Sequence, residues 1–295
     1  MMDGFLIIDK SPGMTSYTVI KRLKRICSFK KIGYIGTLDR NATGILPVAL
    51  NEGVKLIPFL ENGEKRYVAR FQLGITTDTY DLDGTKVTEV EPPKFDRATI
   101  EGTLSRFQGK ISQKVPIYSS KKINGKPLYK WVREGVIIDT PHKEVEVYDI
   151  VLLGYDHPFV DVEVGCSKGT YIRVIAQDFG QLVGCGAVLH SLQRTRHGDF
   201  TLPQSTTLDK IQSEQDILSH LVPPGQALGS LKQFTIDVTL EKFLKNGMPL
   251  PLLGSSREWV NDEYAKLVSK TGNLIAIGRI DTTTKSIRIK RLINN

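Results

Sequence analysis

The chain has 295 residues, of which 40% are hydrophobic and 24% are charged, a composition typical of a globular protein with a hydrophobic core. No stretch approaches the roughly 20 apolar residues that span a bilayer, which argues against a helical membrane protein. The three cysteines lack the spacing of a disulfide framework or a zinc site, so we expect a cytoplasmic protein without a metal.

Positive charge is concentrated in two stretches of this chain, whose formal net charge is +8. Residues 10–40 hold eight Lys and Arg residues against one acidic residue, and residues 110–143 hold eight against two. Clustered cations of this kind are typical of a surface that binds a polyanion, with nucleic acid as the leading candidate. A solvated basic surface without a partner is the alternative for either cluster alone.

The N-terminal part of the chain predicts strands and a helix around a glycine-rich stretch. Apolar residues at 5–8 predict a strand, and Thr15 or Ser16 can cap a helix whose apolar residues recur at helical spacing up to Cys27. The stretch "GYIGTLDRNATGIL" follows at 33–46, and the apolar run 45–51 predicts a strand behind it. Partial alternation predicts another strand at 65–74.

Further along the chain the patterns remain mixed. They predict a helix at 97–109, a strand at 160–166, a helix at 169–184, a strand at 187–198, a surface helix at 208–221 and strands joined by turns after 231. The acidic loop at 76–84 lacks the glycine that a calcium loop needs at its sixth position, where Asp83 stands. We therefore expect no metal in this loop.

Asp39 is the single acidic residue of the glycine-rich stretch. A loop aspartate beside glycines is usually a turn or cap residue. The stretch lacks the Lys-Ser/Thr pair of a phosphate-binding loop, and its "GYIG" matches the short GXXG of a KH domain, a pattern that is common by chance. A catalytic carboxylate is favoured by two later stretches, "KRYVARFQLG" at 65–74 and "CSKGTYIRVIAQDFGQLVGCGAVLHSLQRTRHG" at 166–198.

These three stretches, in this order, resemble the motifs of the bacterial tRNA pseudouridine synthase B family, and the resemblance covers roughly the full chain. It implies an enzyme that isomerises uridine 55 in the T-loop of tRNA to pseudouridine. Asp39 matches the catalytic carboxylate, with Tyr67 and Arg173 as supporting residues and Arg173 as its salt-bridge partner. The resemblance also implies a substrate pocket that is lined by Tyr34, Tyr67, Tyr171 and Leu192.

The chemistry agrees with these residue types. Pseudouridine formation breaks an N–C glycosidic bond and forms a C–C bond, so the isomerisation needs no redox cofactor, ATP or metal. A carboxylate with an ordinary pKa of about 3.9 is ionised at neutral pH and can assist detachment of the base, either as a nucleophile or as a base. We expect the glycines around Asp39 to clear space for RNA. Tyr67 and Tyr171 could otherwise be ordinary core aromatics.

The resemblance further implies an α+β fold. Its catalytic domain, residues 1–228, has a central mixed, mainly antiparallel sheet flanked by helices and carries a thumb-like RNA-binding insertion at 115–140. A small β-rich, PUA-like RNA-binding domain follows at 229–295. The expected partner is the T-arm of tRNA, bound by a monomer without an obligate protein partner. The basic residues expected to contact RNA are Lys10, Arg40, Lys121, Lys122, Lys126, Lys130 and Arg133.

The sequence departs from the family pattern beside Asp39. Tyr34 stands where the family usually has histidine, Arg40 where it has proline, and Ser11 where a proline follows the strand-end lysine. Two other functions remain open. An RNA-guided synthase shares the motifs but lacks the basic insertion, and a non-catalytic RNA-binding or chaperone protein would not need Asp39, Tyr67 and Arg173 together.

Overall fold

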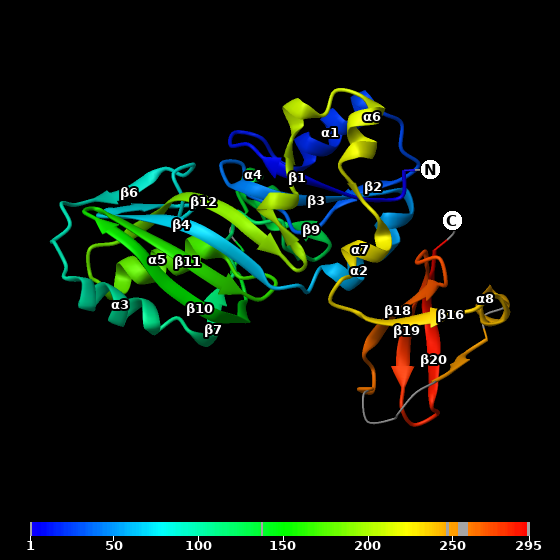
Figure 1. Cartoon of the computed structure of the whole chain (residues 1–295). Helices are drawn as coiled ribbons and strands as arrows, with labels where there is room; N and C mark the ends of the chain where they lie inside the picture. The colour runs from blue at the N-terminus through cyan, green and yellow to red at the C-terminus, as the bar shows by residue number, and fades with distance from the viewer. Residues whose placement is uncertain (1, 137, 246–247, 253–258, 294–295) are drawn as a thin grey trace.

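Figure 1 shows the computed structural model, which describes residues 2–136, 138–245, 248–252 and 259–293. Over these ranges, no helix combines the length and apolar character that a membrane crossing requires. Two separate larger sheets organise the described chain, an eleven-stranded one and a five-stranded one near the C-terminus. Two short two-stranded hairpins complete the β-structure of these residues.

The larger sheet is mixed but mainly antiparallel. Its main path runs β14-β1-β3-β12-β4-β11-β10-β7, with parallel pairs only at β1/β14 and β12/β3. Its strands are β1 (Gly4–Lys10), β2 (Ile32–Tyr34), β3 (Thr43–Leu50), β4 (Lys65–Leu73), β7 (Gly109–Lys114), β10 (His142–Asp156), β11 (Phe159–Cys166), β12 (Ala187–His197), β13 (Phe200–Thr201), β14 (Thr206–Thr207) and β15 (Leu221–Val222). The path places β12 between β3 and β4, so three segments far apart in sequence meet there.

Most helices of this part of the chain pack on the sheet through apolar side chains, whereas α4 lies in the insertion. The α-helices before the smaller sheet are α1 (Ser16–Ile26), α2 (Ile57–Leu60), α3 (Arg97–Ser105), α4 (Leu128–Arg133), α5 (Ile172–Leu182), α6 (Glu214–Ser219) and α7 (Pro224–Ala227). Thr15 caps α1 by accepting a hydrogen bond from the Thr18 amide at 3.1 Å, which confirms the predicted start. On α5, Phe179 packs against Phe71 of β4 with ring centroids 5.9 Å apart.

Some predicted helices are shorter in the structure. The helix predicted at 97–109 ends at Ser105, and strand β7 begins at Gly109. The helix predicted at 208–221 is a 3₁₀ turn, Leu208–Lys210, followed by α6. A capping box between Ser213 and Asp216 fixes the start of α6, because it satisfies the free amide groups at that point.

The predicted insertion at 115–140 emerges between β7 and β10, which pair with one another next to it. It contains the hairpin β8 (Lys122–Ile123) and β9 (Lys126–Pro127), then α4. The turn residues Asn124 and Gly125 both have positive φ, at 52° and 77°, as a two-residue hairpin turn requires. A second hairpin, β5 (Ile75–Thr77) with β6 (Lys86–Glu89), encloses the acidic loop.

The smaller sheet has the order β16-β18-β19-β20-β17, formed by Lys232–Ile236, Tyr264–Ser269, Leu274–Asp281, Ser286–Leu292 and Leu250–Pro251, and it is accompanied by α8 (Val238–Lys245). Figure 1 shows it at the end of the molecule beside α2 and α7. Phe5 and Ile7 of β1 share one buried apolar cluster with Val268 and Ile277 of the smaller sheet. Apolar burial therefore holds the two sheets together.

Candidate active site

The loop that carries Asp39 connects β2 to β3 and is fastened at several points. The Leu38 amide donates to the Ser16 hydroxyl at 3.0 Å, and the Arg40 guanidinium donates to the Gly13 carbonyl at 3.1 Å. The start of α1 and the turn before it therefore hold the residues on both sides of Asp39. The Asp39 side chain itself is 48% exposed, so this loop presents a carboxylate to solvent.

Lys10 lies under the same loop, and the expectation that it contacts RNA does not fit its position. Its side chain is fully buried, and its ammonium donates to the carbonyls of Ser11, Met14 and Arg40 at 2.8–3.0 Å. These bonds use all three ammonium donors, so none is left for a phosphate. Burial lowers the pKa of Lys10 to about 8, and the nearby charge of Asp39 opposes that shift.

Arg173 projects from the first turn of α5 and is almost fully buried, with 5% of its side chain exposed. Its Nη2 donates to the Tyr118 carbonyl at 2.6 Å. Its Nε lies 4.0 Å from a carboxylate oxygen of Asp39 and has no hydrogen-bond partner among the described residues. The structure thus brings the expected pair together, with an unsatisfied donor of the arginine next to the exposed carboxylate.

Asp81 is the closer anion to Arg173, and sequence reasoning missed it. Its carboxylate accepts from Arg173 Nη1 at 3.2 Å, and it is 16% exposed. The neighbouring Asp83 accepts a hydrogen bond from Asn41 of the Asp39 loop. The sequence signal for Asp81 is the acidic loop 76–84, whose carboxylates lack the glycine spacing of a calcium loop. Its carboxylates instead organise the arginine and the loop.

Two of the expected aromatic residues lie at the same place. Tyr67 of β4 is 7% exposed, and burial raises the pKa of its hydroxyl to about 12 against the opposing effect of Arg194. Tyr171 immediately precedes α5 and is half-buried, with the Arg173 guanidinium 5.9 Å from the centre of its ring. Gln113 of β7 exchanges two hydrogen bonds with the Tyr171 backbone, which ties the base of the insertion to the site.

The remaining pocket residues are half-buried on neighbouring strands. Leu192 lies on β12 opposite Ala69 of β4, and Tyr34 ends β2 and packs against the main core. Sheet order therefore explains why residues 34, 67 and 192 can share a site, since β2, β3, β12 and β4 are successive neighbours.

The glycines near Asp39 serve the packing beneath the loop, which corrects the expectation that they clear space for RNA. A Cβ on Gly36 would lie 2.9 Å from both Arg194 Nη1 and His197 Cε1, and one on Gly44 would lie 2.2 Å from the Arg194 carbonyl. Both have positive φ, at 68° and 91°. Glycine is required at both positions because a side chain would collide with β12 and strain the backbone.

A model of the TruB family pseudouridylate synthase N-terminal domain matches residues 24–172, and a model of the tRNA pseudouridylate synthase B C-terminal domain matches residues 173–228. This chain belongs to the TruB family of pseudouridylate synthases.

Relatives match this TruB family member over nearly its whole length. The tRNA pseudouridine synthase B of Syntrophus aciditrophicus (strain SB) is 40% identical over 94% of this chain and 91% of its own. That of Geotalea uraniireducens (strain Rf4) is 37% identical over 99% and 98%. A solved H/ACA RNP bound to a substrate RNA containing 2'-deoxyuridine has a TM-score of 0.77 at 21% identity, covering 100% of this chain and 86% of that one. The match confirms the α+β fold with its small, β-rich, PUA-like C-terminal domain.

Arg40 follows the aspartate at the position where a proline was expected, and hydrogen bonds restrain it there. Proline would fix the backbone φ at that position. Here the Arg40 side chain is held by the Gly13 carbonyl, and its own carbonyl is held by Lys10. Two hydrogen bonds therefore restrain the loop at a position where a proline ring would otherwise do so.

The insertion of this TruB member presents most, but not all, of its expected cations to solvent. Lys121, Lys122, Lys130 and Arg133 are exposed. Lys126 is engaged internally, since its ammonium lies 4.1 Å from the centre of the Trp131 ring and pairs with Glu134. The four exposed cations are therefore better placed than Lys126 to meet a phosphate.

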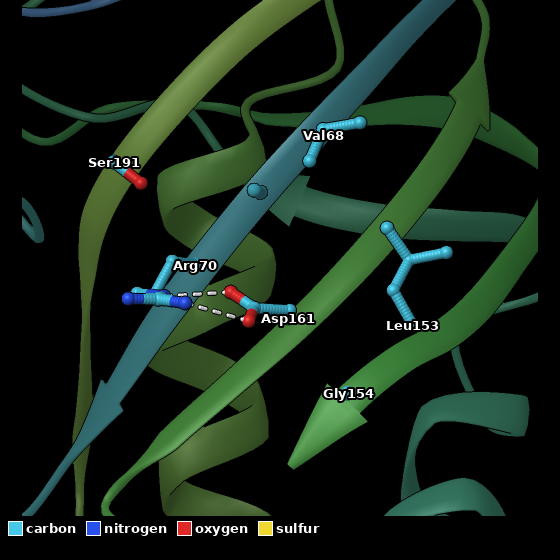
Figure 2. Close-up of a pocket in the computed structure, with 7 residues that line it drawn as sticks. Val68, Arg70, Leu153, Gly154, Asp161 and Ser191 are labelled. Carbon is cyan, nitrogen blue, oxygen red and sulfur yellow. Dashed lines mark hydrogen bonds and ion pairs between the residues drawn. The ribbon is translucent and has the colours of Figure 1, made fainter. Parts of the chain in front are cut away.

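A hollow of about 390 Å³ lies on the opposite face of β4 and does not belong to the site. Figure 2 shows Val68, Arg70 and Asp161 on the side of the strands away from α5, with Arg70 paired to Asp161 at 2.7 and 2.8 Å. Side chains alternate across a strand, so Tyr67 points to the other face. In the described residues, no three His, Cys, Asp or Glu side chains gather as a metal site requires.

Proposed function

We propose that this chain isomerises uridine 55 in the T-loop of tRNA to pseudouridine, with Asp39 as the catalytic carboxylate. The observation that carries the proposal is the pair formed by exposed Asp39 and buried Arg173, whose Nε has no hydrogen-bond partner in the part of the chain that the structure describes. Membership of the TruB family supports the reaction class, and the names of the relatives support tRNA as the substrate.

The geometry suits an accessible carboxylate beside a fixed cation. Arg173 supplies that cation from a buried position, with its Nε 4.0 Å from an oxygen of Asp39. Half of the Asp39 side chain is open to an incoming nucleotide. The carboxylate assists cleavage of the N1–C1′ bond, the base turns over, and C5 bonds to C1′. C5 then loses its proton and N1 gains one, which leaves the enzyme unchanged.

The target uridine must leave its loop to reach Asp39. Flipping a nucleotide costs a few kcal/mol, and stacking on an aromatic side chain returns roughly 1–3 kcal/mol per base. Tyr67, Tyr171 and Tyr34 are the aromatic residues around the site, with Leu192 as an apolar neighbour. Contacts to phosphates supply the remainder of the compensation.

Two basic surfaces are available for those phosphates. The first is the exposed face of α1, where Lys21, Arg22, Lys24 and Arg25 are all solvent-accessible. The second is the insertion with its four exposed cations. We propose that they hold the T-arm on either side of the site, with the domains at 1–228 and 229–295 acting as a monomer without an obligate protein partner. A reducing cytoplasm fits the three free cysteines.

A tRNA transcript that carries tritium at uridine C5 tests this function. Release of tritium by the purified chain alone is expected, with the label lost from position 55. An RNA-guided synthase would release tritium only with a guide RNA, and a pure RNA-binding protein would bind the transcript without release. The insertion at 115–140 favours the stand-alone enzyme.

A further inference from the structure

Arg194 is fully buried beneath the Asp39 loop, and its charge has no carboxylate partner in the described part of the chain. Leaving a buried charge unpaired is costly, so its retention needs a reason. The titratable groups that interact with Arg194 itself come from four strands of the sheet: Lys10 on β1, Lys65 and Tyr67 on β4, Cys166 on β11 and His197 on β12. None of these five is a carboxylate. Around them, the charge of Asp39 acts on Lys10 and Tyr67, and the charges of Glu61 and Lys168 act on Lys65.

Burial and the charge of the buried cation lower the pKa values of the basic side chains around it. Burial, with further contributions from Arg194 and Lys65, lowers the pKa of His197 to about 2, so the imidazole is neutral. Burial and Arg194 likewise lower the pKa of Lys65 to about 8. Burial lowers the pKa of Arg194 as well, but a guanidinium stays charged at neutral pH because its intrinsic pKa exceeds 12.

Arg194 joins the two ends of the Asp39 loop. Its Nη2 donates to the Gly36 carbonyl at 2.9 Å, and its Nε donates to the Ile45 carbonyl at 2.8 Å. Gly36 precedes Asp39 and Ile45 follows it. The absence of side chains at Gly36 and Gly44 is what lets Arg194 and its strand come so close. The planar fork of a guanidinium suits two acceptors at fixed positions.

Arg194 also faces the catalytic-site tyrosine. Arg194 is the cross-strand partner of Tyr67 in the β12/β4 ladder. The positive charge of Arg194 and a hydrogen bond from its side chain lower the pKa of the Tyr67 hydroxyl, although the larger effect of burial raises it. One buried cation therefore contacts both the loop that carries the carboxylate and the tyrosine beside it.

We propose that Arg194 is a positioning residue for the isomerisation, which fixes the Asp39 loop and holds Tyr67 in place as its positively charged neighbour. The proposal rests on the function proposed above. In the step that it serves, Tyr67 first releases its hydroxyl proton to solvent. The tyrosinate then takes the proton from C5, the electron pair of the C5–H bond returns to the ring, and N1 gains a proton from solvent.

Arg194→Lys tests this role because it keeps a charge at neutral pH but replaces the fork by a single ammonium. A lysine in this cluster is expected to titrate near pH 8, as Lys10 and Lys65 do. Single-turnover tritium release from saturating tRNA is measured from about pH 7 to about pH 9. At about pH 7 we expect release to be about tenfold slower than in the wild type, because a single ammonium cannot make both hydrogen bonds to the Gly36 and Ile45 carbonyls. The difference in rate from the wild type should widen at higher pH, as the lysine loses its proton.

Arg196→Lys is the matched control, since Arg196 lies on the same strand and donates to one carbonyl, that of Gly198, at 2.8 Å. Its release and pH profile should match those of the wild type. A profile of Arg194→Lys that runs parallel to the wild type, or an unchanged rate, would overturn the positioning role. Failure of wild-type release would instead overturn the proposed function.

A circular dichroism spectrum that matches the wild type, together with a tRNA affinity within about twofold of it, shows that Arg194→Lys is folded. If Arg194→Lys does not fold, Gly36→Ala disturbs the contact between Arg194 and Gly36 instead, because the alanine methyl would lie 2.9 Å from Arg194 Nη1. Release about tenfold slower with tRNA affinity retained is then expected, and an unchanged rate would overturn the proposal.

Discussion

Neutralising Asp81 tests whether the arginine beside Asp39 depends on a second carboxylate. Asp81→Asn keeps the shape of the side chain but removes the charge that lies 3.2 Å from Arg173 Nη1. Arg173 is 5% exposed, so water cannot replace the lost partner easily. The Tyr118 carbonyl still holds Nη2, which leaves the side chain buried but less firmly oriented toward Asp39.

The size of the effect follows from the kind of bond. A hydrogen bond to a charged group contributes about 1.5–3 kcal/mol, and each 1.36 kcal/mol corresponds to a factor of ten in rate. If this bond is needed to orient Arg173 in the transition state, single-turnover tritium release should fall by roughly 10- to 150-fold. The affinity for tRNA should change little, because Asp81 adds no cation to the RNA surface.

Asp161→Asn is the matched control for this substitution. Asp161 forms a bidentate pair with Arg70, at 2.7 and 2.8 Å, on the face of β4 away from the site, as Figure 2 shows. Its loss removes an ion pair of the same type without touching Arg173. Equal release by wild type and Asp81→Asn, or an equal loss in both variants, would refute the reasoning.

Three further predictions concern RNA binding and stability. Replacing Lys121 and Lys122 by Gln should weaken tRNA binding, measured by filter binding over a range of salt concentrations. The slope of log affinity against log salt should become shallower by about 1–2, because each phosphate contact contributes about 0.7–0.9. An unchanged slope would show that these two lysines do not contact the RNA. Lys10→Met should lower the free energy of unfolding by about 3 kcal/mol in urea titrations, because three carbonyls lose their donor, whereas exposed Lys94→Met should change it little. In the wild type, that free energy should rise between about pH 8 and about pH 10, because Lys10 and Lys65 have pKa values of about 8 when folded and about 10.4 when unfolded, so the unfolded chain binds more protons there. A flat or falling curve across this window would contradict the burial of these two lysines.

Local patterns in the sequence predict much of the fold. Strand β4 alternates strictly between buried and half-buried residues, as its period-two pattern indicates, and Thr15 starts α1 as its capping chemistry requires. Strand β10, His142–Asp156, was not predicted. Register shifts near Val147 and Leu152 interrupt its pairing with β11, so its apolar residues do not keep one alternation over its length.

Some residues of the candidate site could be predicted from the sequence and others could not. Asp39 and Tyr171 both lie beside Arg173, and the charge of Asp39 acts on Tyr67, so the motif residues share one region; their roles stay predictions. The roles of Lys10, Asp81 and Arg194 could not be predicted, because each depends on a contact between segments distant in sequence. A buried lysine bound to three carbonyls and a surface lysine ready for phosphate look alike in sequence, and only the fold distinguishes them.

Tritium release by Asp39→Asn is the most direct test of the catalytic assignment. The substitution removes the charge but keeps the side-chain volume, and Asp39 is exposed on a loop whose other hydrogen bonds remain. We predict no release above background under single-turnover conditions, with tRNA affinity close to that of the wild type. Turnover by Asp39→Asn at a rate near that of the wild type would contradict the assignment of this carboxylate as the catalytic group.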